Sequence, residues 1–203
     1  MALVSASNVR DYLPELSSTG ADSVIVSIIS RVEGAISRLL GFPNTDSGTQ
    51  TLDLSTYTIY VDRPMISDQL ILQLPIKPIG AITSVHSDVN RVYGSDTTIA
   101  SGDYVVDTQL GRLILKPDSY SRSFENGYRS NKVVLTAGYA TGSPPPSLAH
   151  AICIQSALIY RNKATIGRSS INQRETTVKV YSVGIAPEVR ELLYPFRASS
   201  MIL

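Results

Sequence analysis

The chain has 203 residues and a formal net charge of +1, with a single cysteine. A chain of this length buries roughly 70% of its unfolded surface, so it needs no cross-link to be stable. The near-neutral charge argues against a strongly basic nucleic-acid-binding protein, and one cysteine excludes an intrachain disulfide.

No segment indicates secretion or a membrane span. The first ten residues, MALVSASNVR, lack the basic start and the apolar run of a signal peptide. No apolar stretch reaches the about 18 residues that a membrane span requires. We therefore expect a protein made in the cytoplasm without membrane contact, with Cys153 as a small residue of the core.

Two helices are predicted in the first forty residues. Ser7–Leu16 favours a short helix that Pro14 brings to an end. Asp22 is a suitable N-cap for a second helix over Ser23–Leu40, in which apolar residues recur at helical spacing. Gly41 follows as a C-terminal cap. The second helix therefore has one apolar face to bury.

From Asn44 onward, apolar and polar residues alternate, which is typical of strands. The alternating segments are 57–61, 70–74 and 81–85. Asp103–Asp107 and Arg112–Leu115 flank a turn and predict a hairpin. The polar stretch Pro117–Ser130 predicts a surface loop.

The most apolar helix of the chain follows a strand over Val133–Thr136. A turn rich in glycine and proline separates the two, because proline lacks the N–H group that strand pairing needs. We expect Ser147 to be the N-cap of a helix over Leu148–Asn162. Since that helix is apolar on almost all sides, we expect it at the centre of the domain, with the sheet packed against it.

The C-terminal forty residues predict a loop, a strand, a helix and an arm. Lys163–Thr176 has little periodicity, and we expect a mobile loop there. An alternating strand follows over Thr177–Val183. Pro187 begins a final helix and Pro195 ends it, leaving residues 197–203 as an arm with an apolar end.

Together these elements predict an α+β fold in a single domain spanning residues 1–203. Its parts are a small helical bundle of two long helices with short terminal helices, and a small, mostly antiparallel β-sheet. Loops 91–102 and 117–130 receive no role.

The sequence holds none of the common catalytic and nucleotide-binding motifs: HExxH, CxxC, the P-loop, GxSxG or GxGxxG. The histidines, His86 and His150, have no third ligand near them in the sequence, so we read them as ordinary histidines rather than zinc ligands. The aspartates lie in predicted turns or at strand ends, where aspartate is common. A glycosidase-type carboxylate pair among them stays an alternative. We expect no catalytic residue, no metal and no cofactor.

A series of short motifs runs along nearly the whole chain in a fixed order. The chain resembles the head–tail connector (adaptor) proteins of long-tailed bacteriophages in this series. The first motif is the apolar helix that Gly41 caps, which resembles the opening helix of the connectors. It is followed by LxLPIxxI at 72–79, TSV at 83–85, and DYxxD at 103–107 with GxL at 111–113. The last motifs are TAGY at 136–139, a proline-rich turn at 144–146, YRN at 160–162 and EVRxLLxPxR at 188–197.

This resemblance implies a structural virion protein that is located at the head–tail junction and is not an enzyme. Connectors form a ring, typically of twelve copies, beneath the portal protein. The ring extends the DNA channel and offers an attachment surface to the next neck, stopper or tail component.

The resemblance also assigns roles to two segments. The C-terminal region of connectors contacts the portal, which implies docking by Val189, Leu192, Leu193, Tyr194, Phe196, Arg197, Met201, Ile202 and Leu203. On the residues alone, the inward half of this stripe also fits the domain's own core, and the apolar end also fits a disordered tail. Lys163, Arg168 and Arg174 would face the channel and contact passing DNA without reading bases, or would simply keep a loop soluble.

Two other functions stay open. One is a small hydrolase or carbohydrate-binding module of a phage tail, which requires converging acids or aromatic residues. The other is a different ring protein of the neck, a stopper or tail terminator. Such proteins are usually β-rich throughout, so the two strong helices disfavour this alternative.

Overall fold

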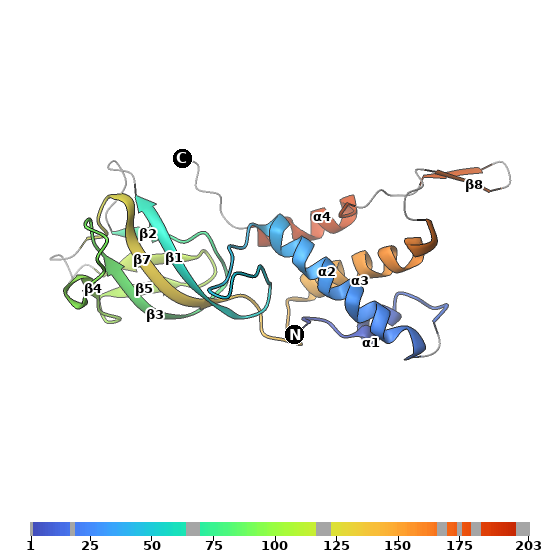
Figure 1. Ribbon diagram of the computed structural model, residues 1–203, viewed down its shortest axis with the longest axis horizontal. Coiled ribbons are helices and arrows are strands. Elements are labelled where there is room, and N and C mark those ends of the chain that lie inside the picture. Colours follow the sequence, from blue (N-terminus) through green and yellow to red (C-terminus); the bar gives the residue numbers. More distant parts are fainter. Residues whose placement is uncertain are drawn as a thin grey trace. The chain divides into compact units, whose positions relative to one another are not determined.

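The structure is a computed structural model that describes residues 2–16, 19–63, 70–116, 123–165, 170–173, 176–179 and 184–197. It confirms an α+β fold. The chain divides into two compact units: a helical unit of Met1–Leu40 with Ala140–Arg197, and a sheet unit whose described residues lie within Gly41–Tyr139 (Figure 1). Each unit has its own buried apolar residues, and a single domain spanning residues 1–203 stays a prediction.

The helical unit is built from α1 (Ala6–Arg10), α2 (Asp22–Leu40), α3 (Pro146–Arg161) and α4 (Pro187–Leu193). α3 is the central helix of this unit, because α1, α2 and α4 all contact it (Figure 1). The apolar face of α2 is buried, as its spacing predicted, through Ile25, Ile28, Ile29, Val32, Ile36 and Leu40. The packing of the sheet against α3 stays a prediction.

Three helix starts differ from the predicted ones. α2 begins at Asp22 itself, directly after a 3-10 helix over Thr19–Ala21, so Asp22 is its first residue rather than its N-cap. α1 begins after Ser5, whose hydroxyl accepts the N–H of Asn8 while the Asn8 side chain accepts the N–H of Ser5, and the helix ends at Arg10. α3 begins at Pro146 rather than after Ser147. The first N–H groups of a helix have no carbonyl partner within the helix, so a proline, which lacks this group, is favoured at the first position. The proline-rich turn therefore continues directly into α3.

The expected loop Lys163–Thr176 contains regular structure. Asn162–Thr165 form a 3-10 helix, and β8 (Ser170–Gln173) pairs antiparallel with β9 (Thr176–Lys179). The sequence did not indicate β8, because its residues, SINQ, show no apolar alternation. Residues 166–169 and 174–175 lie outside the described residues, so the mobility of this segment stays a prediction.

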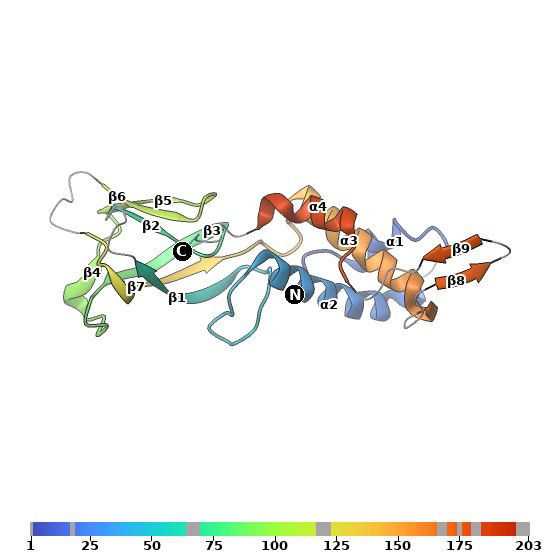
Figure 2. The ribbon, with the colours of Figure 1, turned by 90° about the horizontal axis from the view of Figure 1, so that it is seen from above.

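The sheet unit holds two antiparallel sheets. The four-stranded sheet has the order β1 (Ser55–Arg63), β7 (Gly127–Ala137), β3 (Ile79–Ser87) and β4 (Thr98–Ile99). The three-stranded sheet has the order β2 (Ile71–Gln73), β6 (Arg112–Leu115) and β5 (Tyr104–Asp107), which confirms the predicted hairpin. Figure 2 shows the two sheets as two layers.

The core of the sheet unit follows the strand period of two. Tyr57 lies opposite Leu135, and Ile59 opposite Val133, and all four side chains are buried. Because successive side chains alternate between faces, Tyr60 and Lys132 lie on the other, solvent-facing side of this sheet. β7 begins at Gly127, so the loop that we expected through Ser130 ends earlier.

The glycine of the TAGY motif has a clear structural reason. Gly138 adopts a φ of 110°, and a Cβ there would lie 2.6 Å from the carbonyl oxygen of Asp53. This close approach lets the next residue, Tyr139, exchange two backbone hydrogen bonds with Leu52 and Leu54. Only glycine fits such a position without displacing backbone.

Candidate interaction surfaces

Helix α4, the predicted docking element, is fixed to α3 by apolar and polar contacts. Val189 and Leu193 are buried, at 0% and 1% exposure. In addition, Gln155 of α3 accepts the N–H of Ala186 through Oε1 at 2.9 Å and donates from Nε2 to the carbonyl of Gly184 at 3.4 Å. α4 is therefore a well-supported surface element of the helical unit.

The residues predicted to dock divide into three groups. Val189 and Leu193 belong to the core of the helical unit, which is the alternative that the sequence left open for the inward half of the stripe. Tyr194, at 72% exposure, and Arg197 are open to solvent, while Leu192 and Phe196 are half-buried. The remaining docking residues, Met201, Ile202 and Leu203, lie outside the described residues.

The three cations predicted to face DNA are not all described. Lys163 is exposed in the 3-10 helix that follows α3. Arg168 and Arg174 lie outside the described residues, so their grouping with Lys163 stays a prediction.

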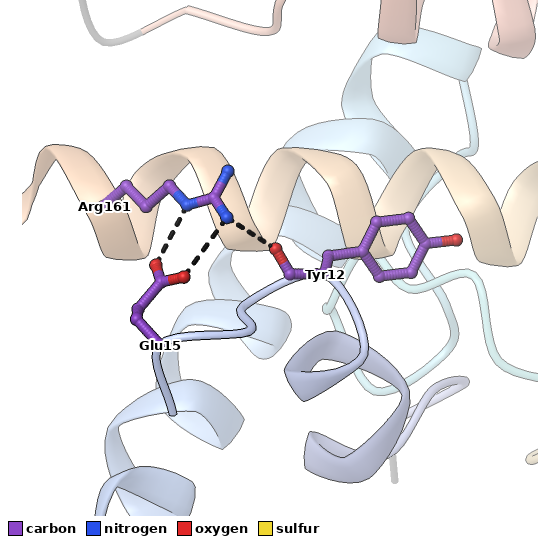
Figure 3. Close-up of polar contacts among 3 residues, drawn as sticks. All are labelled: Tyr12, Glu15 and Arg161. Atoms are coloured by element: carbon purple, nitrogen blue, oxygen red, sulfur yellow. Dashed lines mark hydrogen bonds and ion pairs between the residues drawn. The ribbon is translucent and has the colours of Figure 1, made fainter. Parts of the chain in front are cut away.

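A polar cluster joins the end of α3 to the segment after α1 (Figure 3). Arg161 donates from Nε to Glu15 Oε1 at 3.0 Å, and from Nη2 to Glu15 Oε2 at 3.3 Å and to the Tyr12 carbonyl at 2.9 Å. The hydrogen bond from Arg161 holds the pKa of Glu15 below its ordinary value. Since both side chains are about half exposed, this pair fixes geometry more than it adds stability.

Next to this cluster, the helical unit carries a groove of about 880 Å³. Its walls come from residues 2–12, from the turn at 141–146 and from Ala149, His150 and Cys153 of α3. The Tyr12 hydroxyl lies 2.7 Å from His150 Nδ1, and Leu3 donates its N–H to Glu33 of α2 at 2.7 Å. This groove could not be predicted from the sequence, because Tyr12 and His150 are 138 residues apart.

The groups in this groove do not form a catalytic arrangement. Burial raises the pKa of the Cys153 thiol to about 11, so at neutral pH it is a protonated, buried group rather than a nucleophile. His150 is hydrogen-bonded to Tyr12, and no carboxylate of the described residues orients its ring. The groove thus offers shape and polar contacts rather than nucleophilic catalysis.

In the described parts of the chain, no three His, Cys, Asp or Glu side chains converge as ligands for a metal ion. None of the helices in those parts is both long and apolar enough to span a bilayer.

Solved structures share this fold over almost the whole chain. A chain in the neck of an empty gene transfer agent (GTA) particle, computed with C6 symmetry, matches with a TM-score of 0.57 and 17% identity, covering 98% of this chain and 92% of that one. A chain in the neck of the native GTA particle, computed with C12 symmetry, matches with a TM-score of 0.53 and 16% identity over 97% and 90%.

A chain in the virion of the native GTA particle also matches, with a TM-score of 0.55 and 16% identity over 98% of this chain and 92% of that one. No protein-family model matches the chain, and neither does any curated protein. At these identities the likeness establishes the fold alone.

Proposed function

We propose that this protein is a structural component of the neck of a phage-like particle and serves there as the head–tail connector (adaptor). The observation that carries the proposal is a fold shared over 98% of this chain with a chain of a GTA neck. The ordered motifs from Gly41 to Arg197 support the same function independently of the fold, because they belong to the amino-acid sequence alone.

In this function the protein acts through contacts between copies. A ring, typically of twelve subunits, sits beneath the portal, extends the DNA channel and presents an attachment surface to the next neck or tail component. The C6 and C12 symmetries of the GTA necks support a ring of copies. Head-to-tail contacts close into a ring when the rotation between subunits closes, and many modest contacts together give firm attachment.

The portal would bind the C-terminal end of the helical unit. Leu192, Tyr194, Phe196 and Arg197 supply the accessible part of this docking site, and residues 198–203 supply an apolar arm that orders on the partner. α4 offers the arm a rigid base, since Gln155 and the buried residues Val189 and Leu193 hold the helix in place.

Deleting Ala198–Leu203 tests the docking arm. We expect an unchanged circular dichroism spectrum and weaker co-purification with the portal, because the arm would add apolar contacts to the partner. A full-length variant with Met201, Ile202 and Leu203 all replaced by serine separates the loss of apolar surface from the loss of length. Portal attachment as tight as in the parent chain would contradict the docking arm.

Lys163, Arg168 and Arg174 would face the channel and contact passing DNA through its phosphates. Replacing all three with glutamine should change genome retention or ejection, measured as DNA release from purified particles. A matched triple glutamine variant of Arg31, Arg38 and Lys116, all exposed, makes the same change in net charge elsewhere. Particles that retain and eject DNA normally would refute the contact.

The main test combines solution mass and imaging of the particle. We expect the purified chain to assemble as a ring on purified portal, and to occupy the head–tail junction in an electron-microscopic reconstruction of the neck. A location lower in the neck would favour a stopper or tail terminator. Turnover of a glycan by the purified chain, with no binding to the portal, would favour the hydrolase.

A further inference from the structure

One cluster of aromatic and basic side chains on the four-stranded sheet plays no part in the packing of the sheet unit. Tyr60 of β1, Lys132 of β7, His86 of β3 and Thr98 of β4 lie opposite one another in register, so they form one row across the solvent-facing side. Tyr93, from the β3–β4 connection, lies over this row. We call Tyr60, His86, Tyr93, Arg129 and Lys132 the Tyr60 surface.

The contacts within the Tyr60 surface are mutual. The Arg129 guanidinium lies 4.1 Å from the centre of the Tyr60 ring, and the Lys132 ammonium 5.5 Å from that of Tyr93. The two tyrosine rings are 5.7 Å apart. Arg129 is exposed and Lys132 is half-buried, so both cations stay accessible to an anion while the rings position them.

The backbone holds two of these residues in an unfavourable conformation. Tyr93 has a φ of 55° and Arg129 a φ of 52°, in the left-handed region that residues with a Cβ rarely adopt. Asp62 accepts the N–H of Arg129 at 2.7 Å, and the Tyr93 hydroxyl donates to the Arg129 carbonyl. Strain of this kind persists where the surroundings enforce it, and it is frequent at binding sites.

A buried carboxylate enforces the loop that carries Tyr93. Asp88 accepts the backbone N–H groups of Asn90, Val92 and Tyr93 at 2.8 to 2.9 Å. These bonds, that of Tyr93 foremost, hold the pKa of Asp88 below its ordinary value. The placement of Tyr93 is thus built into the loop, although its side chain adds little to the core.

The charges of this surface have no counterpart nearby. Within the described ranges of the chain, no carboxylate forms an ion pair with Arg129, Lys132 or the neighbouring Arg91. Asp62 and Asp88 instead use their oxygens to accept backbone N–H groups. The Tyr60 surface therefore offers unpaired positive charge to a partner that carries carboxylates or phosphates.

The surrounding residues favour a protein partner over nucleic acid. Val89 and Val92, in the same loop as Tyr93, are 57% and 78% exposed, and Tyr128, beside Arg129, is 66% exposed. Exposed valines gain from burial against protein, whereas contacts to a nucleic-acid backbone use polar and charged groups. Tyrosine and arginine are also the residues that most often dominate protein interfaces.

The same chain carries a complementary surface on α4. Glu188 and Glu191 lie one helical turn apart on its outward side, away from the buried Val189 and Leu193. Both are exposed, and within the part of the chain that the structure describes neither side chain has a hydrogen bond or ion pair.

We propose that the Tyr60 surface of one copy receives the Glu188–Glu191 side of α4 of the next copy in the ring. This inference rests on the proposed connector function, since only an assembly brings two copies together. A contact between different surfaces of identical subunits is head-to-tail, which is the kind that closes a ring. The ring contact uses the start of α4, and the proposed portal docking uses its end and the arm beyond.

Charge reversal tests this contact. The variants are Arg129→Glu with Lys132→Glu, Glu188→Lys with Glu191→Lys, and all four together. We expect each pair alone to weaken self-association on the portal by at least about tenfold, and the fourfold variant to recover to within about threefold of the parent, because close charge pairs couple strongly. Self-association is measured as ring occupancy by mass photometry of the chain with portal, at several salt concentrations.

A control variant, Arg31→Glu with Arg38→Glu, makes the same charge change on an exposed side of α2 and should leave ring occupancy unchanged. The parent ring should also weaken as salt rises, which tests the charge contact without any substitution. Circular dichroism of each variant separates lost contact from lost folding.

The outcomes separate the inference from the proposed function. Rings that form on portal but ignore either reversal, or reversals that the fourfold variant does not rescue, would overturn the Tyr60–α4 contact and leave the connector function standing. Duplex DNA bound through Arg129 and Lys132, with self-association intact in the reversal variant, would also overturn it. A parent chain that forms no ring with portal would overturn both.

Discussion

Replacing Gln155 with leucine tests how α4 is held on α3. The substitution removes both hydrogen bonds that join the centre of α3 to the turn before α4. Ala186 is 4% exposed, so its N–H loses its acceptor in a buried position, which costs about 1–3 kcal/mol. The bond to Gly184 is long at 3.4 Å, and water can replace it because Gly184 is exposed. Leucine nearly conserves the volume and leaves no cavity.

We therefore expect the free energy of unfolding of the helical unit to fall by about 1–3 kcal/mol. Urea denaturation followed by circular dichroism measures this change. Hydrogen exchange with mass spectrometry should in addition show faster exchange over 184–197. Gln109→Leu, in an exposed turn, is the matched control and should change stability by less than about 0.5 kcal/mol. Unchanged stability and unchanged exchange in Gln155→Leu would refute the assigned role.

Three further predictions follow from single contacts. Gly138→Ala should lower the free energy of unfolding of the sheet unit by at least about 2 kcal/mol, measured by urea denaturation. The control Gly142→Ala, at a φ of 73° with open space around the residue, should lower the free energy of unfolding by only about 1 kcal/mol. Equal losses in the two variants would contradict the steric argument. Cys153 should react with iodoacetamide at pH 8 only when the protein unfolds, and rapid labelling of the native protein would count against its burial. Folding raises the pKa of this thiol from 9.0 to about 11, so its contribution to the free energy of unfolding should be lost as the pH rises from about 9 to 11. Asp46 accepts the N–H of Thr58 on the edge strand β1 at 2.7 Å, so Asp46→Ala leaves this edge free to pair with a strand of another molecule. The variant should therefore aggregate on storage, measured by light scattering. Scattering no higher than that of the parent chain would contradict this role.

The periodicity of the sequence was sufficient for most of the elements. Helix α2 and the hairpin of β5 and β6 appear close to where their patterns placed them, because apolar spacing reports directly on which face is buried. The TAGY motif could be recognised but not explained, since the contact of Gly138 with Asp53 joins two distant segments. β8 was missed because its stability comes from pairing with β9 and not from an apolar pattern of its own.

The interaction surfaces were much less accessible from the sequence. The stripe on α4 could be found by its spacing, but only the fold separates the buried Val189 from the exposed Tyr194. Polar partners leave no periodic signal: Arg161 meets Glu15 across 146 residues, and Arg129 lies over Tyr60 where an irregularity shifts the register between β1 and β7. Local patterns thus determine which segments are helix or strand. The side chains that meet on a surface are set by topology and register, which depend on contacts between segments far apart in the chain.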